Sequence, residues 1–392
     1  MGQIILVETF GSGLLPFGAD IHELTLQTGA GGLVLQGVAG EATTARIVQI
    51  ELDGGASFQG NTFLGPSHDG FVLAEFGARD YHLSASLIAA DLTAPYGETG
   101  QAFCLSDLNS GFAGDSLRLV GASSGTGQFV VAAQPGGAGL SVASVSGGAL
   151  SAFTALPDEG EGRISDLATV WMGGQTWVLA ASDGNDSVIS YAMSPAGTLS
   201  YTAEFGAAEG LGIGDAVAVR AVTVDGQAYA LVAGAESSSI SVLSLEPDGS
   251  FRAVDHVIDS LDTRFSGIVH LETIESGGIT FVVAAGSDDG FSLFRFRPDG
   301  KLLHLGSYAD TAQTVLDNPA ALALAVDQGA LHIAVASATE AGISHFSYDL
   351  SRQGGTLSGG AGADAISGTG LDDMILGAGG DDVLSGKAGN DV

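Results

Sequence analysis

Apolar and polar residues alternate along residues 1–350 in a pattern that repeats about every fifty residues. Each repeat begins with a glycine turn and an apolar strand, then has a polar loop and an alternating strand, such as ISVLSL at 240–245. A tight turn such as Asp248-Gly249 follows, and this dipeptide favours a two-residue β-hairpin. A fourth short strand, such as RAVDHV at 252–257, ends the repeat. The glycine turns, of which the second is the weakest, lie at Gly32, Gly77, Gly127, Gly174, Gly226, Gly278 and Gly329.

Four hairpin-linked strands per unit, repeated in tandem, are typical of a β-propeller. We therefore predict an all-β fold in which residues 1–350 form a seven-bladed β-propeller. The last unit lacks a fourth strand, and IILVETF at 4–10 resembles the missing one. We expect this N-terminal strand to close the last blade, which also removes exposed strand edges. A stack of β-sandwich domains of about a hundred residues is the alternative, but the single-unit period argues against it.

The last three dozen residues have a different period, of nine residues, in which an aspartate ends each of four glycine-rich hexads. These aspartates are Asp364, Asp373, Asp382 and Asp391. Aliphatic residues follow the first three by two positions, at Ile366, Ile375 and Leu384. Glycines let backbone carbonyls turn inward, aspartate supplies a hard anionic oxygen, and the aliphatic residue fills the inside of a coil. Oxygen ligands of this kind suit calcium, and the period is that of a parallel β-helix.

The tail matches the consensus G-G-x-G-x-D-x-U-x and therefore resembles the RTX (repeats-in-toxin, hemolysin-type) calcium-binding nonapeptides. The resemblance implies a short parallel β-roll at 359–392, which we expect to follow a linker at 351–358. In the family, calcium lies between hexads two repeats apart, which pairs Asp364 with Asp382 and Asp373 with Asp391. Carbonyls of the hexad glycines complete the sites, with Ca²⁺ as the expected cofactor. The implied metal-binding residues are Gly359, Gly360, Gly362, Asp364, Gly368, Asp373, Gly377, Gly379, Asp382 and Asp391.

Three of the hexads depart from the consensus, because Thr369, Ala378 and Lys387 replace the second glycine. Two calcium sites is the largest number that four repeats can build. Solenoids of this kind are stable with about three or more stacked units. The sequence stops at Val392, inside the fourth repeat, so we expect the natural chain to continue.

The composition restricts the partners and the compartment. The net charge is −33, from 45 acidic and 12 basic residues, which makes nucleic acid and anionic membrane surfaces poor partners. No stretch of about 20 apolar residues predicts a membrane span. Cys104 is the single cysteine and is expected to be a buried small hydrophobe. The N-terminus lacks the features of a secretory signal, while the RTX resemblance implies export by type I secretion to the extracellular space.

The longer loops between the strands of the propeller hold a second group of candidate residues. They would share one face of the ring, and binding residues commonly lie on loops that a rigid scaffold positions. Their carboxylates could hold a divalent cation or act as acid and base, or they could be solvated loop residues of an acidic protein. The candidates are Asp158, Glu161, Asp166, Asp215, Asp262 and Asp317, with Arg163 and Arg264 nearby. His332 and His345 lie on strands of the last blade and could face each other, as strand residues rather than metal ligands.

The strand and turn pattern of the blades is similar to that of seven-bladed propellers of the lactonase kind, without a catalytic motif that carries over. The sequence therefore favours a secreted calcium-binding RTX protein whose propeller is a platform for a glycan, small-molecule or cell-surface partner. The alternative is a secreted propeller enzyme, either a lactonase-like hydrolase or a polysaccharide-active enzyme. A surface-layer or adhesion component is a third interpretation, because the chain is acidic and calcium-dependent.

Overall fold

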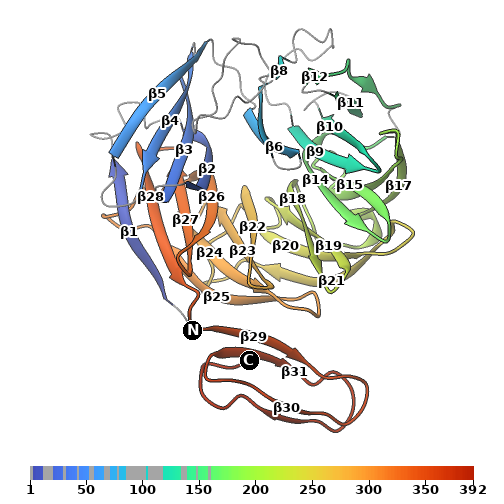
Figure 1. The fold of residues 1–392 in the computed structure, drawn as a ribbon, viewed down its shortest axis with the longest axis vertical. Helices are drawn as coiled ribbons and strands as arrows, with labels where there is room; N and C mark the ends of the chain where they lie inside the picture. The colour runs from blue at the N-terminus through green and yellow to red at the C-terminus, as the bar shows by residue number, and fades with distance from the viewer. Residues whose placement is uncertain are drawn as a thin grey trace.

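Sheets of antiparallel strands follow one another around a ring, and a small separate coil lies at its edge, as the computed structural model shows (Figure 1). The structure describes residues 3–11, 21–29, 32–41, 44–52, 57–65, 71–76, 79–84, 103–104, 118–133, 139–146, 149–157 and 160–392. In these ranges each sheet of the ring is built mainly from consecutive strands. The ring is the predicted seven-bladed β-propeller, and we refer to its sheets as blades.

The blades follow the order of the chain. Blade one contains β2 (Ile21–Gly29), β3 (Gly32–Glu41), β4 (Thr44–Glu51) and β5 (Ser57–Gly65). Blade two contains β6 (Phe71–Phe76), β7 (Arg79–Ser84) and β8 (Phe103–Cys104). Blade three contains β9 (Arg118–Ser124), β10 (Gly127–Ala133), β11 (Leu140–Ser146), β12 (Ala149–Leu150) and β13 (Thr154–Ala155). Blade four contains β14 (Ile164–Met172), β15 (Gln175–Ser182), β16 (Ser187–Met193) and β17 (Leu199–Gly206), followed by the 3-10 helix η2 (Ala207–Glu209).

The last three blades are the most regular. Blade five contains β18 (Ala216–Val224), β19 (Gln227–Gly234), β20 (Ser239–Leu245) and β21 (Phe251–Ile258). Blade six contains β22 (His270–Ser276), β23 (Ile279–Gly286), β24 (Gly290–Phe296) and β25 (Leu302–Ala309). Blade seven contains β26 (Pro319–Asp327), β27 (Ala330–Ser337) and β28 (Gly342–Asp349), with β1 (Ile4–Gly11) antiparallel to β28 at its outer edge. The two ends of the ring's chain therefore meet in one sheet.

The first strand of each blade lies innermost, and from blade two onward it contacts the first strand of the next blade. These contacts run from β6 through β9, β14, β18, β22 and β26 to β2. Blade two departs from the regular pattern, because β8 pairs parallel with β7. Its glycine turn is also the weakest of the seven in the sequence. In blade three, β12 and β13 both pair with β11.

The core of the propeller is a series of apolar layers, each between two adjacent blades. Strand β19 shows how one strand supplies two layers. Ala230 and Val232 pack toward blade four, whereas Leu231 and Ala233 pack toward blade six. Successive side chains of a strand point to opposite faces, and both faces of the blade are covered. This explains why the second strands of the repeats read as nearly continuous apolar runs.

The C-terminal coil consists of two small parallel sheets. Strand β29 (Gln353–Ser358) pairs with β31 (Asp372–Leu376), and β30 (Ala365–Ser367) pairs with β32 (Val383–Ser385). This is a short parallel β-roll, and Figure 1 shows it next to blade six, beside β25. Residues 351–358, predicted as a linker, instead include a strand of the roll, because their backbone finds pairing partners two repeats later.

Candidate calcium site in the C-terminal roll

The pairing register of the roll places residues two nonapeptides apart side by side. Ala365 pairs with Val383 and Thr356 pairs with Met374, an offset of 18 residues in both cases. Each turn of the coil is therefore two repeats long. Because aspartate recurs every nine residues in the sequence, this register brings aspartates of the first and third repeats together, and those of the second and fourth.

Backbone hydrogen bonds connect the aspartates of each pair. The N–H of Asp364 donates to Oδ1 of Asp382 at 2.9 Å, and the N–H of Asp373 donates to Oδ1 of Asp391 at 3.0 Å. Oδ2 of Asp364 accepts a hydrogen bond from the N–H of Gly360 at 2.6 Å. Asp364 therefore accepts a hydrogen bond within its own hexad, whereas Asp382 and Asp391 accept theirs from the hexads of their partners. These are the two pairs that the RTX resemblance implies.

The second pair is oriented by a residue that departs from the consensus. Oδ2 of Asp373 accepts hydrogen bonds from the N–H and from Oγ1 of Thr369. The N–H of Thr369, more than any other group, holds the pKa of Asp373 below its ordinary value, because a hydrogen bond to the charged form favours that form. The threonine that replaces glycine in this hexad thus fixes a carboxylate as an anion.

Glycines stand where carbonyl and carboxylate oxygens converge. A Cβ atom on Gly359 would lie 2.5 Å from the carbonyl oxygen of Gly377 and 2.8 Å from Oδ2 of Asp364. A Cβ on Gly368 would lie 2.6 Å from the carbonyl oxygen of Gly386 and 2.8 Å from Oδ2 of Asp373. Only glycine leaves such a cradle open. Its lining of anionic and carbonyl oxygens is the donor set that calcium prefers, so the residues present fit this ion.

The second consensus position of the later hexads has a conformational requirement. Ala378 has φ of 61° and Lys387 has φ of 72°, both in the left-handed region where a side chain costs about 1–2 kcal/mol. The consensus glycine at this position avoids that cost. The degenerate third and fourth hexads therefore adopt the backbone of the repeat at the expense of local strain.

Among the described residues, no group of three or more His, Cys, Asp or Glu side chains lies close enough together to hold a metal ion. The paired aspartates of the roll would contribute two carboxylates per pair, and backbone carbonyls would supply the rest of the donor set. Carbonyl ligands are common in calcium sites. The signal for calcium in this chain is accordingly in the backbone and the repeat period, not in a dense acidic cluster.

The structure shows individual contacts for most of the candidate residues of the propeller. Asp158 lies outside the described residues. Glu161 is buried, with 1 % of its surface exposed, and accepts a hydrogen bond from Oη of Tyr191 at 3.0 Å. Burial and then Glu161 raise the pKa of Tyr191, so the phenol remains a neutral donor. This is a structural contact inside blade four.

The remaining loop candidates have contacts of their own. The hydrogen bond and charge of Asp183, and to a smaller extent the charge of Asp215, raise the pKa of Arg163. Arg163 forms an exposed ion pair with Asp183. Asp262 is exposed, and the guanidinium of Arg264 donates to the carbonyl oxygen of Thr263 at 2.8 Å. Asp215 has φ of 55°, in the left-handed region, and the carboxylate of Asp317 accepts a hydrogen bond from the side chain of Asn318. A common site for these residues stays a prediction.

Asp166 belongs to a charged cluster on the innermost strands of three blades. Nη1 of Arg220 on β18 lies 2.6 Å from Oδ2 of Asp166 on β14, and Nη2 lies 2.6 Å from Oε1 of Glu272 on β22. Burial lowers the pKa of Arg220, but the two carboxylates, Glu272 foremost, outweigh it and raise the pKa. The Arg220 side chain is 27 % exposed, so the cluster remains open to water. The sequence analysis missed Arg220 and Glu272, although Arg220 is a lone charge inside the apolar run AVAVRAVTV.

His332 and His345 do face each other, with Nδ1 of His332 2.9 Å from Nε2 of His345. His345 is buried. Burial, and then the neighbouring imidazole, lower the pKa of His345 to about 4. The pair lies on β27 and β28 as strand residues, and the neutral form of His345 is the one the fold accommodates.

The comparisons with known proteins agree with this division of the molecule. The RTX calcium-binding nonapeptide repeat (HemolysinCabind) matches residues 356–392, in four copies. The C-terminal segment is therefore a set of RTX repeats, which bind calcium. No curated protein sequence matches the chain.

Solved structures resemble the fold of the whole chain. The crystal structure of BBS1N in complex with ARL6DN, soaked with mercury, matches with a TM-score of 0.57 and 9 % identity, over 89 % of this chain and 99 % of that chain. A protein from Lactobacillus plantarum matches with a TM-score of 0.41 and 17 % identity, over 88 % of this chain and 99 % of that one. Only the first similarity bears on the fold. Because 649 chains match in all, the fold is widespread and does not decide the activity. Within the described ranges, no helix has the length and hydropathy to cross a bilayer.

Proposed function

We propose that the chain is a secreted calcium-binding protein of the RTX type, in which the roll folds on calcium and the propeller binds a partner. The observation that supports this most is the stacking of Asp364 on Asp382 and of Asp373 on Asp391 in glycine cradles. Without a cation, stacked carboxylates repel one another across each turn. A cation removes that repulsion, and its binding free energy becomes folding free energy of the roll.

Calcium links the roll to the compartment. Extracellular calcium modules bind with dissociation constants of about 10⁻⁴–10⁻³ M, far above the free calcium of a cytosol. The chain would leave the cell with the roll unfolded, by the type I route of RTX proteins, and fold outside. Expression in a host with a type I secretion apparatus tests the route. Appearance in the medium only when the apparatus is active supports export, and equal amounts without the apparatus would exclude it.

Calcium binding itself is tested by isothermal titration calorimetry on the full chain, with Asp364→Asn and Asp373→Asn as site variants. Each substitution keeps the shape of the side chain and removes its charge, so each is expected to abolish one binding event. Asp299→Asn is the matched control, because Asp299 lies in a blade-six turn and pairs with Arg297. Absence of heat at millimolar calcium in the unaltered chain would refute the proposal.

The propeller is proposed to be a binding platform for a glycan, small-molecule or cell-surface partner. Two observations support this role. BBS1N, which resembles this chain in fold, was crystallised in complex with ARL6DN. The Asp166–Arg220–Glu272 cluster presents both positive and negative charge at the innermost strands. Screening the chain on a glycan array, with Arg220→Met as comparison, tests it. Turnover of lactones or polysaccharides that is lost in Arg220→Met would instead establish the enzymatic alternative.

A further inference from the structure

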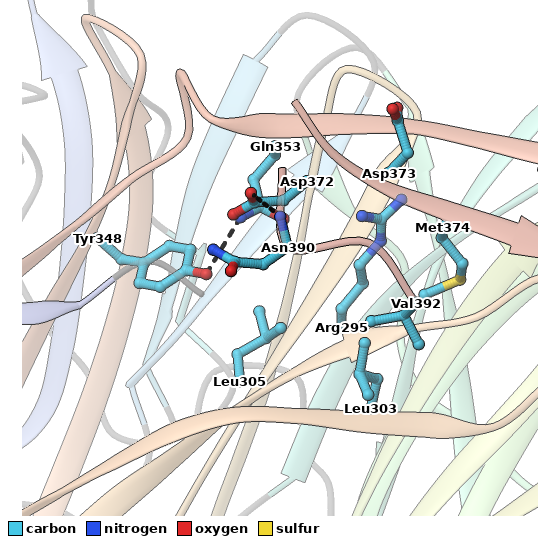
Figure 2. A pocket seen from close by; sticks show the side chains of 10 residues that line it. All are labelled: Arg295, Leu303, Leu305, Tyr348, Gln353, Asp372, Asp373, Met374, Asn390 and Val392. Atoms are coloured by element: carbon cyan, nitrogen blue, oxygen red, sulfur yellow. Dashed lines mark hydrogen bonds between the residues drawn. The ribbon is translucent and has the colours of Figure 1, made fainter. Parts of the chain in front are cut away.

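The roll contacts the propeller along one seam, which Figure 2 shows from close by. Residues of blades six and seven lie on one side, and residues of the roll on the other. The residues that line the seam are Arg295, Leu303, Leu305, Tyr348, Gln353, Asp372, Asp373, Met374, Asn390 and Val392. Asp373 is a candidate calcium ligand, and four other lining residues adjoin Asp373 or Asp391 in the sequence, so the seam bears on how the roll folds.

Strand β29 is an unrecognised fifth unit of the roll. Leu357 stands nine residues before Ile366, at the aliphatic position of a repeat, and Thr356 pairs with Met374 two repeats later. Gly355 stands at the position that aspartate occupies in the four later units. The first turn of the roll therefore has the backbone of an RTX turn but lacks one of its two carboxylates.

A propeller arginine enters this incomplete turn. Arg295, on β24, is only 3 % exposed. Its Nη2 donates to Oγ1 of Thr356 at 2.9 Å and to the carbonyl oxygen of Gly354 at 3.4 Å. Figure 2 shows its guanidinium directed toward Asp373. In the described part of the chain, Nε of Arg295 and Oδ1 of Asp373 are both buried without a hydrogen bond of good geometry.

Charge and apolar contact act together in the seam. Gly354, whose carbonyl oxygen accepts from Arg295, lies against the carboxylate of Asp373, because a Cβ atom on Gly354 would lie 2.2 Å from Oδ1 of Asp373. Met374, 1 % exposed, is buried where Leu303 and Leu305 of β25 line the same seam. A buried arginine is costly unless it meets negative charge and acceptors, and the first turn of the roll supplies both.

We propose that Arg295 takes in the first turn of the roll the place that calcium takes in the later turns, so that the propeller caps the roll and keeps β29 and β31 folded without calcium. Repeat solenoids require caps at their ends, because a terminal unit cannot cover its own open face. The inference goes beyond calcium binding, since the first turn is folded before the ion arrives.

Hydrogen exchange on the full chain in the presence of a calcium chelator tests the cap. The variants are Arg295→Met, which keeps the stem but removes the charge, and Arg297→Met. Arg297 is a matched control because it is two residues away and pairs with Asp299 outside the seam. Amides of β29 and β31 should exchange about 10-fold or more faster in Arg295→Met and at the unaltered rate in Arg297→Met. Equal protection in both variants would overturn the proposal.

Two further variants keep the test decisive. If Arg295→Met prevents folding of blade six, Arg295→Lys is the second variant, because it keeps the charge. In chelator, Arg295→Lys is expected to retain part of the protection of β29 and β31. Complete loss of that protection in a folded Arg295→Lys chain would overturn the proposal. The double variant Arg295→Met with Gly355→Asp restores the missing carboxylate, and a Cβ on Gly355 meets no atom within 4 Å. Calcium should now protect β29 and bind with one additional ion per chain. Absence of this rescue would show that Arg295 and calcium are not equivalent.

The two proposals fail separately. Protection of β29 and β31 in chelator does not depend on whether any calcium binds. If the unaltered chain gives no calorimetric signal with calcium, but β29 and β31 lose protection in the Arg295→Met variant, the cap stands and the calcium function is wrong.

Discussion

Blade six and the roll lie against each other and are built on opposite principles. In blade six, every residue of β23 and β24 is buried, including Arg295, and apolar area removed from water supplies the stability. In the roll, the strands are short, and aliphatic residues such as Val383 and Leu384 are 69 % and 48 % exposed. Its turns instead stack carboxylates. We therefore expect the propeller to fold by its own apolar layers, and we expect the roll to depend on cations, from solution or from the propeller.

The most disruptive change is expected in the apolar layer between blades six and seven. Phe291 is fully buried and packs against Phe346 and Tyr308. Phe291→Ala should lower the free energy of unfolding by about 3–5 kcal/mol, equally with calcium and with chelator. Guanidinium unfolding under both conditions measures it. Leu384→Ala in the roll is the contrast, at below about 1 kcal/mol because the side chain is half exposed. A calcium-dependent cost of Phe291→Ala would break the comparison.

The propeller should respond to pH where the roll responds to calcium. The folded pKa of His345 is about 4, lowered by burial and then by His332, against about 6.5 unfolded. The unfolded state therefore binds more protons between these two pH values. The contribution of His345 to the free energy of unfolding is complete above pH 6.5 and is lost as the pH falls toward 4. The expected loss is about 2–3 kcal/mol.

Thermal unfolding from pH 7 to pH 4 measures this effect, and His345→Gln should flatten the profile. Part of the slope should remain, because burial also lowers the pKa of His270 to about 4. Asp288 opposes the trend, since burial raises its pKa to about 6. His256→Gln, at an exposed position of β21, is the control for replacement of a histidine outside this pair. A flat profile in the unaltered chain would contradict the assignment.

Removal of a stacked carboxylate should affect only the calcium response. At calcium about 100 times the dissociation constant, one site contributes about 2.7 kcal/mol, and Asp382→Asn should lose about 2 kcal/mol of that gain. Asp381→Asn is the adjacent control, because Asp381 is exposed and lies outside the aspartate register. Melting temperatures with and without calcium distinguish them. Equal responses of the two variants would mean that charge number, not register, governs binding.

The smallest effect is expected at the inner strands. Arg220→Met leaves the carboxylates of Asp166 and Glu272 without their cation, but both are partly open to water. The cost should be about 1–2 kcal/mol, independent of calcium, as measured by guanidinium unfolding. Arg163→Met removes a more exposed ion pair with Asp183 and should leave the midpoint unchanged. Equal costs would show that the cluster has no special role in joining blades.

Local periods in the sequence predict the strands, the hairpins and the turns of the coil. Period-two runs with glycine turns specify strands and hairpins, so the blades follow from the chain, and residues 4–10 were placed where β1 pairs with β28. The nine-residue period likewise determines which aspartates stack, because the parallel register is two periods long. A weak turn at Gly77 gave little information about blade two.

Which charged residues meet depends on the packing of the blades and the roll. Arg220 reaches carboxylates 52 and 54 residues away, on neighbouring blades, and Arg295 reaches Thr356 over 61 residues. No local pattern encodes such pairs, because they depend on how whole blades and the roll pack. The same holds for β29, whose missing aspartate hides it from the consensus until β31 lies beside it. The repeat period determines which residues stack within the roll, whereas tertiary packing determines which charged residues from different blades and from the roll come together.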